Sequence, residues 1–459
     1  NFTYTEYAYD KGGCLTRQEV RHPGYGQLCA FDYYYDDAGN RTKVVLDDDA
    51  NDWLQYDYDD LYRLTREQRS GTANDYTNTY TYDAVGNRVA SNRTTDGYAY
   101  LEYFYNDINQ LTMYNDPDEA EYPDQVRMAY DANGNMTKRQ CYAYTSGYSA
   151  DDDNYTKYEW DSRNLMTKTT TRVGGGAPTD YTFAYDALGR RESMTADGTT
   201  TDYFYEGLGV LVEKTGAVTK SYLNSGAPVG GIISVDDGDD VTYYHYDAIG
   251  NVVETTDDIG APVATYVQDA FGNVISGTAS GYHLTTKEYF DDFGLYYFNM
   301  RWYDPFTGRF ISKGPMPPYE EHPYAYCEND PVNSIDPSGY GWGRTILDSW
   351  WWSGFIIVGA TCKLPCDWMH KPEFSPGLAP LPSPGNTDFS DGLVTPGGYL
   401  KIPNGCELII ECNAAGKVTG LPTCCTNLID LFAPPRYYPP TAPPPGFPAV
   451  PAPCPTCRR

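Results

Sequence analysis

Basic residues are scarce in this chain of 459 residues. Lysine and arginine total 33 against 63 aspartates and glutamates, so the formal net charge is −30. A polyanionic surface repels nucleic acid and anionic lipid, so neither is an expected partner. All of the net negative charge lies before residue 342, because the remaining segment carries equal numbers of acidic and basic residues.

Long apolar runs and known catalytic motifs are missing as well. The longest largely apolar run, residues 350–361, is too short to cross a bilayer, so we expect no membrane span. The sequence has no Gly-x-Ser-x-Gly elbow, no P-loop and no His-Glu-x-x-His, and its five histidines are scattered. These absences predict a protein that is not an enzyme and needs no cofactor. No secretory signal is present and the chain begins inside a repeat, so we expect a processed or trimmed amino end.

Tyrosine, in contrast, is abundant, with 46 copies, and it favours strands that are buried on one side. A Tyr-Asp pair recurs along the chain at intervals of 23 to 30 residues. A catalytic group is needed once, so a repeated pair indicates architecture. The members are Tyr9-Asp10, Tyr35-Asp36, Tyr58-Asp59, Tyr82-Asp83, Tyr105-Asn106, Tyr130-Asp131, Trp160-Asp161 and Tyr185-Asp186, with weaker copies at Tyr205-Glu206, Tyr246-Asp247 and Gln268-Asp269.

Each copy predicts a β-hairpin. Alternating aromatics such as Tyr80 and Tyr82 indicate one face of a strand, and the acid begins a turn that ends on a glycine. Arg88 opens the return strand, and we expect it to pair with the acidic surface around it. Stacked hairpins predict an all-β ribbon in which tyrosines form ladders. The expected turn residues are Asp36, Asp59, Asp83, Gly86, Asp131, Gly134, Asp186, Gly189, Asp247 and Gly250.

The repeated pattern YDxxGN/R resembles the YD repeat of the RHS family. Residues 243–273, ending in DAFGN, with DDFGLYYFNMRWYDPFTGRFIS (291–312) and HPYAYCENDPVNSIDPSG (322–339), resemble the RHS repeat-associated core domain. The resemblance implies a β ribbon that spirals into a solenoid-like or partial shell, which in toxins of the family encloses a cleaved effector. It also implies three domains, namely repeats at 1–242, a core domain at 243–340 and a variable region at 341–459.

The same resemblance implies an aspartyl autoprotease, which requires two carboxylates that share a proton. One expected acid is present as Asp336 in IDPSG, with the matching cut after Tyr340. Gly314 stands where the other acid is expected. Asp304, Glu320 and Glu321 lie near in sequence, but their spacing does not recommend them as substitutes. We therefore predict an inactive protease and an uncleaved tail.

The tail has a different composition, with 20 of the 33 prolines and eight of the 12 cysteines. Closely spaced cysteines predict an irregular segment with disulfides, formed in an oxidising compartment. Zinc is the alternative, with Cys362, Cys366 and His370 as ligands. The disulfide candidates are Cys362, Cys366, Cys406, Cys412, Cys424, Cys425, Cys454 and Cys457.

Two further kinds of surface site are suggested by composition. Acidic clusters at residues 47–49, 151–153 and 236–240 offer oxygen ligands for Ca²⁺, although none has the spacing of a dedicated loop, so the prediction is no metal site. Asn-x-Ser/Thr sequons give candidates for glycosylation at Asn1, Asn40, Asn92, Asn135 and Asn154.

Two functions from different classes follow. The first is an exported structural protein at the cell surface or outside the cell, which assembles with copies of itself into a filament or coat. The alternative is a toxin-delivery shell of the RHS type whose carboxy-terminal region is a small effector or its remnant.

Overall fold

The computed structural model describes residues 3–71, 75–94, 100–115, 125–144, 147–227, 229–278, 280–314, 322–341, 343–344, 393–395 and 398–400. The chain divides into two compact units, the second of which contains Asp10–Cys14 and Thr361–Pro444. In that second unit β33 (Leu393–Thr395) pairs antiparallel with β34 (Gly398–Leu400).

One antiparallel sheet of 23 strands, here called the wall, dominates the first unit. Each strand pairs with the next one along the chain, from β1 with β2 to β22 with β23. The strands are β1 (Tyr4–Tyr9), β2 (Leu15–His22), β3 (Gly26–Tyr35), β4 (Arg41–Leu46), β5 (Asp49–Tyr58), β6 (Leu64–Ser70), β7 (Tyr76–Tyr82), β8 (Arg88–Arg93), β9 (Leu101–Tyr105), β10 (Leu111–Asn115), β11 (Gln125–Tyr130), β12 (Met136–Tyr144), β13 (Tyr148–Trp160), β14 (Met166–Arg172), β15 (Thr179–Tyr185), β16 (Arg191–Ala196), β17 (Thr199–Glu206), β18 (Gly209–Thr215), β19 (Val218–Asn224), β20 (Ile232–Asp236), β21 (Val241–Tyr246), β22 (Val252–Thr256) and β23 (Pro262–Thr265).

The turn of each Tyr-Asp hairpin is built by its aspartate. The Oδ1 atom of Asp83 accepts hydrogen bonds from the backbone N–H groups of Val85 (3.0 Å) and Asn87 (2.8 Å). Gly86 has a φ of +93°, a conformation that costs glycine little and other residues more. Where a repeat lacks this glycine, Tyr62, Asn109 or Asn164 adopts positive φ instead.

The tyrosine before the aspartate sits at a β-bulge. Tyr82 pairs with Arg88 whereas Thr81 pairs with Ala90, so Val89 is an extra residue on the return strand. The same shift falls on the tyrosine of hairpins β1–β2, β3–β4, β5–β6, β11–β12 and β15–β16. Bulges increase the local twist of a sheet, so a bulge in each repeat favours a curved wall.

Tyrosine hydroxyls link successive hairpins. The Tyr82 hydroxyl donates to the backbone carbonyl of Leu64 in the preceding return strand, at 2.7 Å. Trp160 replaces the tyrosine in one repeat and keeps the link through its indole N–H. The repeat tyrosines are therefore joined by hydroxyl-to-carbonyl bonds to the neighbouring hairpin. Equivalent bonds are made by Tyr35, Tyr58, Tyr105, Tyr130 and Tyr185.

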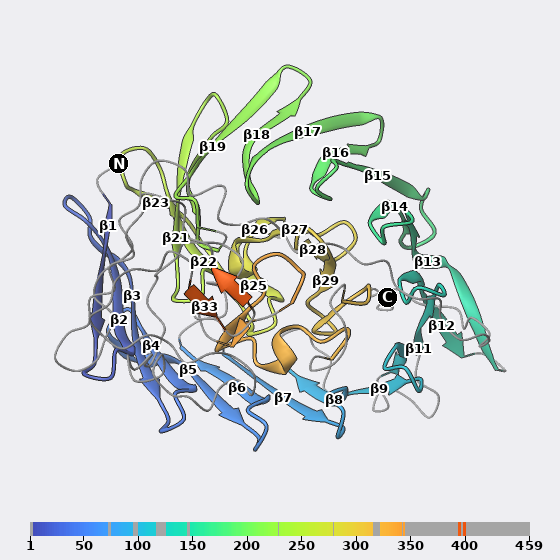
Figure 1. Ribbon diagram of the computed structural model, residues 1–459, viewed down its shortest axis with the longest axis horizontal. Helices are drawn as coiled ribbons and strands as arrows, with labels where there is room; N and C mark the ends of the chain where they lie inside the picture. The colour runs from blue at the N-terminus through green and yellow to red at the C-terminus, as the bar shows by residue number, and fades with distance from the viewer. Residues whose placement is uncertain are drawn as a thin grey trace. The chain divides into compact units, whose positions relative to one another are not determined.

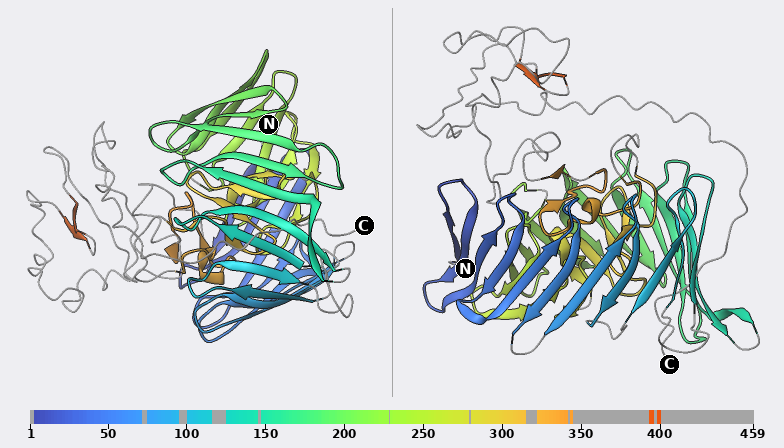
Figure 2. Two further views of the ribbon diagram at one scale, coloured as in Figure 1. Left: turned by 90° about the vertical axis from the view of Figure 1, so that its right-hand side faces the viewer. Right: turned by 90° about the horizontal axis from the view of Figure 1, so that it is seen from below.

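The wall curves around the elements that follow it, and its strands run between two rims (Figures 1 and 2). Its last strands lie against the inner face of its first ones. The side-chain amide of Gln18 in β2 donates to the carbonyl of Tyr246 (2.6 Å), and the Tyr33 hydroxyl in β3 accepts from the N–H of Ala248 (3.1 Å). The ribbon is thus a spiral, as the fold prediction of an all-β shell-like sheet states, and that prediction is confirmed.

The described residues from 267 to 344, here called the core block, form small sheets within the curve of the wall (Figure 1). The wall and the core block share large apolar clusters. One contains Tyr103, Met128 and Met166 from the wall with Phe293 and Trp302 from the core block. The elements of the core block are β24 (Val267–Gln268), β25 (Val274–Ser276), β26 (Gly281–Tyr282), η1 (Leu284–Thr286), β27 (Glu288–Phe290), β28 (Leu295–Tyr297), β29 (Trp302–Asp304), β30 (Arg309–Phe310), η2 (Cys327–Asn329), β31 (Ser334–Ile335) and β32 (Gly343–Arg344).

The main sheet ends at Thr265 in β23, beyond the expected end of the repeats at residue 242. The domain boundaries 1–242, 243–340 and 341–459 stay predictions. Within the described ranges, no helix has the length and apolar character needed to cross a membrane.

Candidate functional site

Asp336 is buried in a tight turn of the core block. Its Oδ1 accepts hydrogen bonds from the N–H groups of Gly339 (2.8 Å) and Ser338 (3.3 Å), and Oδ2 lies 3.0 Å from Nη2 of Arg301. Gly339 has a φ of +76°, and a Cβ atom there would lie 2.6 Å from the Phe298 carbonyl oxygen, so only glycine fits. The bond after Tyr340 therefore follows directly on a turn held by the Asp336 carboxylate.

Arg301 lies between Asp336 and the position expected to carry the second acid. A Cβ atom at Gly314 would lie 3.3 Å from Nη1 of Arg301, and the N–H of Gly314 donates to the Pro323 carbonyl at 2.8 Å. The fold thus places both expected positions against one guanidinium group, although they are 22 residues apart in the numbering of the sequence. Asp336 supplies the carboxylate on one side, and glycine supplies none on the other.

The alternative acids do not complete the pair. Asp304 is bound by Arg139, with 3.1 Å between Oδ2 and Nη1, and both side chains are 1% exposed. Glu320 and Glu321 lie outside the described residues. Because an acid pair requires two carboxylates that share a proton, the described site has a structural turn and not a proteolytic pair. Inactivity of the protease stays a prediction.

The electrostatics around Asp336 are dominated by burial. Burial raises the pKa of the Asp336 carboxyl, while the charge of Arg301 and the two N–H donors lower it. Burial lowers the pKa of the nearby Lys287 ammonium to about 8, although the charge of Asp336 opposes this shift. The thiol of Cys327 is buried and free, and burial raises its pKa well above the ordinary value. A buried thiol in this state is a poor nucleophile.

Arg301 and Lys287 were missed by the sequence reasoning. They lie 35 and 49 residues before Asp336, directly before β29 and β27 respectively, and no local motif links them to it. The family resemblance marked the IDPSG turn but no cation beside it, so only the fold reveals the arginine that holds it.

Arg88 is buried and does not pair with the acidic surface, so the expectation for this residue is wrong. Its side chain is 2% exposed and points into the core block, with its guanidinium 4.5 Å from the ring centre of Tyr80 and 4.1 Å from that of Phe271. Arginine stacks well on aromatic faces because its planar cation is weakly hydrated. The arginine opening this return strand therefore anchors the wall to the core block.

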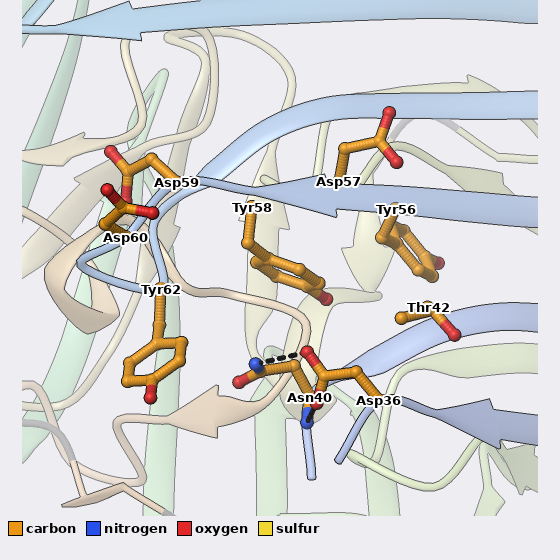
Figure 3. Close-up of a pocket in the computed structure, with 9 residues that line it drawn as sticks. All are labelled: Asp36, Asn40, Thr42, Tyr56, Asp57, Tyr58, Asp59, Asp60 and Tyr62. Atoms are coloured by element: carbon orange, nitrogen blue, oxygen red, sulfur yellow. Dashed lines mark hydrogen bonds between the residues drawn. The ribbon is translucent and has the colours of Figure 1, made fainter. Parts of the chain in front are cut away.

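A polar groove lies between two neighbouring repeat turns at the rim of the wall (Figure 3). Asp36 and Asn40 from one turn and Asp59, Asp60 and Tyr62 from the next line it. Asp36 is bonded to Asn40 within its own turn, and Asp59 is paired with Arg63 at 2.7 Å. The remaining lining residues are Thr42, Tyr56, Asp57 and Tyr58.

The acidic clusters proposed for Ca²⁺ are bonded to protein groups. Asp47 accepts from the N–H of Ala30 at 2.8 Å, and Asp48 pairs with Arg17 at 2.7 Å. Asp153 pairs with Arg172 at 3.2 Å, while Asp237 accepts N–H bonds within its own turn. Metal binding at these clusters is untested, and no group of ligands suited to a metal occurs in the described part of the chain.

The candidate glycosylation sites differ in their surroundings. Asn92 is exposed on β8, whereas Asn135 is 1% exposed and its amide nitrogen donates to Asp131 (3.0 Å) and Asn164 (2.9 Å). The amide of Asn40 donates to Asp36 in its own turn, and that of Asn154 donates to Asp151 within β13. Asn1 lies outside the described residues. A glycan on Asn135 would require both of its bonds to break, so Asn92 is the better acceptor.

The cysteine candidates Cys362, Cys366, Cys406, Cys412, Cys424, Cys425, Cys454 and Cys457, and the alternative zinc ligand His370, all lie outside the described residues. Of the other cysteines, Cys14 and Cys141 are disulfide-bonded, and Cys29 and Cys327 are free and buried.

Comparisons with known proteins give tRNA nucleases, a deaminase toxin and, over 58 residues, a salivary gland surface protein of Aedes aegypti as relatives. No family model matches the chain. It is 32% identical over 228 residues to the tRNA3(Ser)-specific nuclease WapA of Bacillus spizizenii, which covers 46% of this chain and 9% of that protein. It is 28% identical over 252 residues to the Double-stranded DNA deaminase toxin A of Burkholderia cenocepacia, covering 47% of this chain and 17% of the relative.

Among solved structures, the chain resembles the crystal structure of TcdB2-TccC3-Cdc42 with a TM-score of 0.39 and 17% identity, over 73% of this chain and 20% of that one. The chain spans less than a tenth of the length of the WapA nuclease that it matches. The relatives support the resemblance to RHS-type toxins, and they favour the toxin-delivery alternative over a filament or coat. No enzymatic activity is shown for this chain.

Proposed function

We propose that this chain is part of an RHS-type toxin-delivery shell. The wall and the core block form the shell portion, and residues 341–459 are a small effector or the remnant of one. The observation that carries the proposal is the similarity to a WapA nuclease and to a DNA deaminase toxin, each over nearly half of the chain. The filament expectation has no comparable support.

The geometry of the described residues fits a container. The wall spirals around the core block, and large apolar clusters hold the two together. Buried ion pairs join them as well, with Arg93, Arg139 and Arg191 from the wall facing Asp269, Asp304 and Glu288 from the core block. A shell that must resist opening needs such contacts between segments that are distant in the sequence.

The proposal includes an uncut tail that acts outside the producing cell. Asp336 has an arginine partner and no second carboxylate at Gly314. On this proposal the bond after Tyr340 stays intact, and an effector in the tail acts while it is still attached.

Imaging tests the shell against the filament. Purified full-length chain, kept unreduced, is expected to give single compact particles by electron microscopy. The same sample on a denaturing gel should run as one band near 51.4 kDa. Ordered polymers would contradict the proposal, and a fragment beginning at Gly341 would contradict its uncut tail.

Competition between cells tests delivery. Donor bacteria that produce the full-length chain are grown with recipients that lack it, and recipient survival is counted. Survival should fall only with the full chain, and it should recover when a stop codon replaces Gly341. Equal survival with the two donors would mean that the tail is not a delivered effector.

A further inference from the structure

The tips of the repeat turns carry aliphatic side chains where a polar residue would serve. The residue two places after the first turn residue is Leu61, Val85 and Ile108 in three successive hairpins, and these side chains are 62%, 59% and 61% exposed. The same position is Asn133 in the next hairpin and Arg163 in the one after it. The turn therefore tolerates polar residues, and the aliphatic ones are not needed to form it. We call Leu61, Val85 and Ile108 the tip row.

The tip row lies along one rim of the wall. Each Tyr-Asp turn joins an odd-numbered strand to the following even-numbered one, so all these turns fall on the same end of the antiparallel sheet. Successive tips are separated by two strands, or about 10 Å. Three tips therefore form a line about 20 Å long.

The backbone of each tip is held by a hydrogen bond within its own turn. The N–H groups of Leu61, Val85 and Ile108 each donate to the side-chain oxygen of their own turn's first residue, at 3.0, 3.0 and 3.2 Å. A fixed backbone lowers the entropy lost on association. These three side chains are thus presented as preformed apolar knobs.

Phe271 shows how the same turn position behaves when it is covered. It follows Asp269 by two residues, and its N–H donates to that aspartate at 3.0 Å, as in the tip row. Its side chain is fully buried, with its ring centre 5.0 Å from that of Tyr80. A knob of this kind inserts into an apolar hole in this very protein.

The surroundings of the tip row select the charge of a partner. Asp60 and Asp107 precede two of the tips and are exposed, and the neighbouring turn exposes Asp36 and Asp37. The groove between those turns is lined mainly by acids and tyrosines (Figure 3). A second copy of this chain would bring the same acidic rim and a net charge of −30, so like charges oppose it. A basic partner is favoured.

We propose that the tip row docks a basic amphipathic helix of a partner protein. Seven residues of an α-helix rise about 10.5 Å, which matches the spacing of the tips. Along one face of such a helix, the gaps between side chains repeat every seven residues, so each tip would insert into one gap. Lysines or arginines of the helix would face the acids of the rim. This inference does not depend on the proposed function.

A synthetic peptide serves as the probe. It has 24 residues, with leucine at two positions of each heptad and lysine at most others, and a fluorescent label. A second peptide has the same composition in scrambled order. Binding to the purified full-length chain is measured by fluorescence anisotropy. The periodic peptide is expected to bind at least tenfold more tightly than the scrambled one.

Variants locate the site. Leu61→Asn, Val85→Asn and Ile108→Asn are combined, because asparagine occupies the same turn position naturally at Asn133. The control combines Leu188→Asn with Ile259→Asn, which replace exposed aliphatic residues at the same turn position outside the row. The row variant should lose at least tenfold in affinity, and the control should keep the wild-type value. Thermal unfolding of each variant checks that it is folded.

Three outcomes would overturn the proposal. One is equal binding of the periodic and scrambled peptides, which would show attraction to charge alone. Another is equal affinity of the row variant and the control. The last is a dimer of the wild-type chain in sedimentation that the row variant lacks, since a second copy would then be the occupant.

Discussion

The pKa values of single carboxyl groups in this protein depend on how deeply the fold buries them. Glu67 in β6 is 1% exposed and accepts hydrogen bonds from the Tyr76 hydroxyl (2.6 Å) and the Ala270 N–H (2.9 Å). Burial, and then the charge of Asp269, raise the pKa of the Glu67 carboxyl to about 8. Asp336 is equally buried, but Arg301 lies beside it. Burial raises the pKa of both carboxyls, and at Asp336 the charge of Arg301 opposes that rise.

Glu67→Gln should flatten the dependence of stability on pH. The folded-state pKa of about 8 lies above the ordinary value of 4.5, so the folded chain binds the extra proton between these values. This stabilisation is fully present below pH 4.5 and is lost as the pH rises towards 8, with an effect on the order of a few kcal/mol. Urea unfolding at pH 5, 7 and 9 measures it. The exposed Glu192→Gln is the control, and a variant with the wild-type pH slope would contradict the assignment.

Gly314→Asp is expected to restore cleavage after Tyr340. The new side chain starts 3.3 Å from Arg301, which already holds Asp336, so two carboxylates would share one site. A denaturing gel and amino-terminal sequencing should reveal a fragment beginning at Gly341. Gly314→Asn, which has the same size without the acid, should stay intact, as should Gly314→Asp combined with Asp336→Asn. An intact Gly314→Asp chain would show that position 314 is not the missing partner.

At the scale of the hairpin, aspartate and tyrosine have separate roles. Asp83 closes its own turn through bonds to Val85 and Asn87, while Tyr82 reaches the preceding hairpin at Leu64. Arg63 connects forwards, because its Nε donates to Asp59 and its Nη1 donates to the Asp83 carbonyl at 2.8 Å. Each hairpin is therefore bonded to its neighbours by side chains as well as by strand pairing.

Tyr82→Phe and Asp83→Ala test these two roles. Loss of the tyrosine hydroxyl removes one hydrogen bond and should cost about 1 kcal/mol in the free energy of unfolding. Asp83→Ala removes several bonds to one carboxylate and should cost about 2–4 kcal/mol. Asp83→Asn keeps an acceptor for the turn and should cost less. Urea unfolding measures all three. The exposed Asp37→Ala is the control, and a cost as large as that of Asp83→Ala would refute the turn role.

At the scale of the whole first unit, the wall and the core block are joined across long stretches of sequence. Arg139 and Asp304 form an ion pair in which both side chains are 1% exposed. Arg191 in β16 reaches Glu288 of β27, and its guanidinium lies 4.0 Å from the Tyr203 ring centre. Such pairs tie each section of the wall to the core block it surrounds.

Asp304→Asn should loosen the core block. The amide keeps the Oδ1 acceptor used by the Phe306 N–H, but it leaves the charge of buried Arg139 without the Asp304 carboxylate that neutralises it. Breaking a buried pair in this way typically costs about 3–5 kcal/mol. Faster hydrogen exchange in β29 and β30 is the expected result. Asp180→Asn, at the exposed pair with Lys168, should leave exchange there unchanged. Unchanged exchange in Asp304→Asn would show that this pair does not secure the core block.

The sequence by itself determined the repeat and the all-β fold. Strand, turn and positive-φ glycine are local properties, so Tyr82, Asp83 and Gly86 could be interpreted within a dozen residues. It also marked Asp336 and Gly314 as the positions to compare, through a family resemblance. Turn tips such as Leu61 were visible in the sequence, but their exposure was not.

Only the tertiary structure decided which distant groups meet. Arg301 holds Asp336 from 35 residues away, Arg139 reaches Asp304 across 165 residues, and Arg88 is buried instead of facing the acidic surface. The physical reason is that the curvature of the wall determines which face of each strand packs against the core block. The local sequence around a repeat arginine does not show whether its side chain faces solvent or, as in Arg88, the ring of Phe271. Its partner is therefore determined only when the wall packs around the core block.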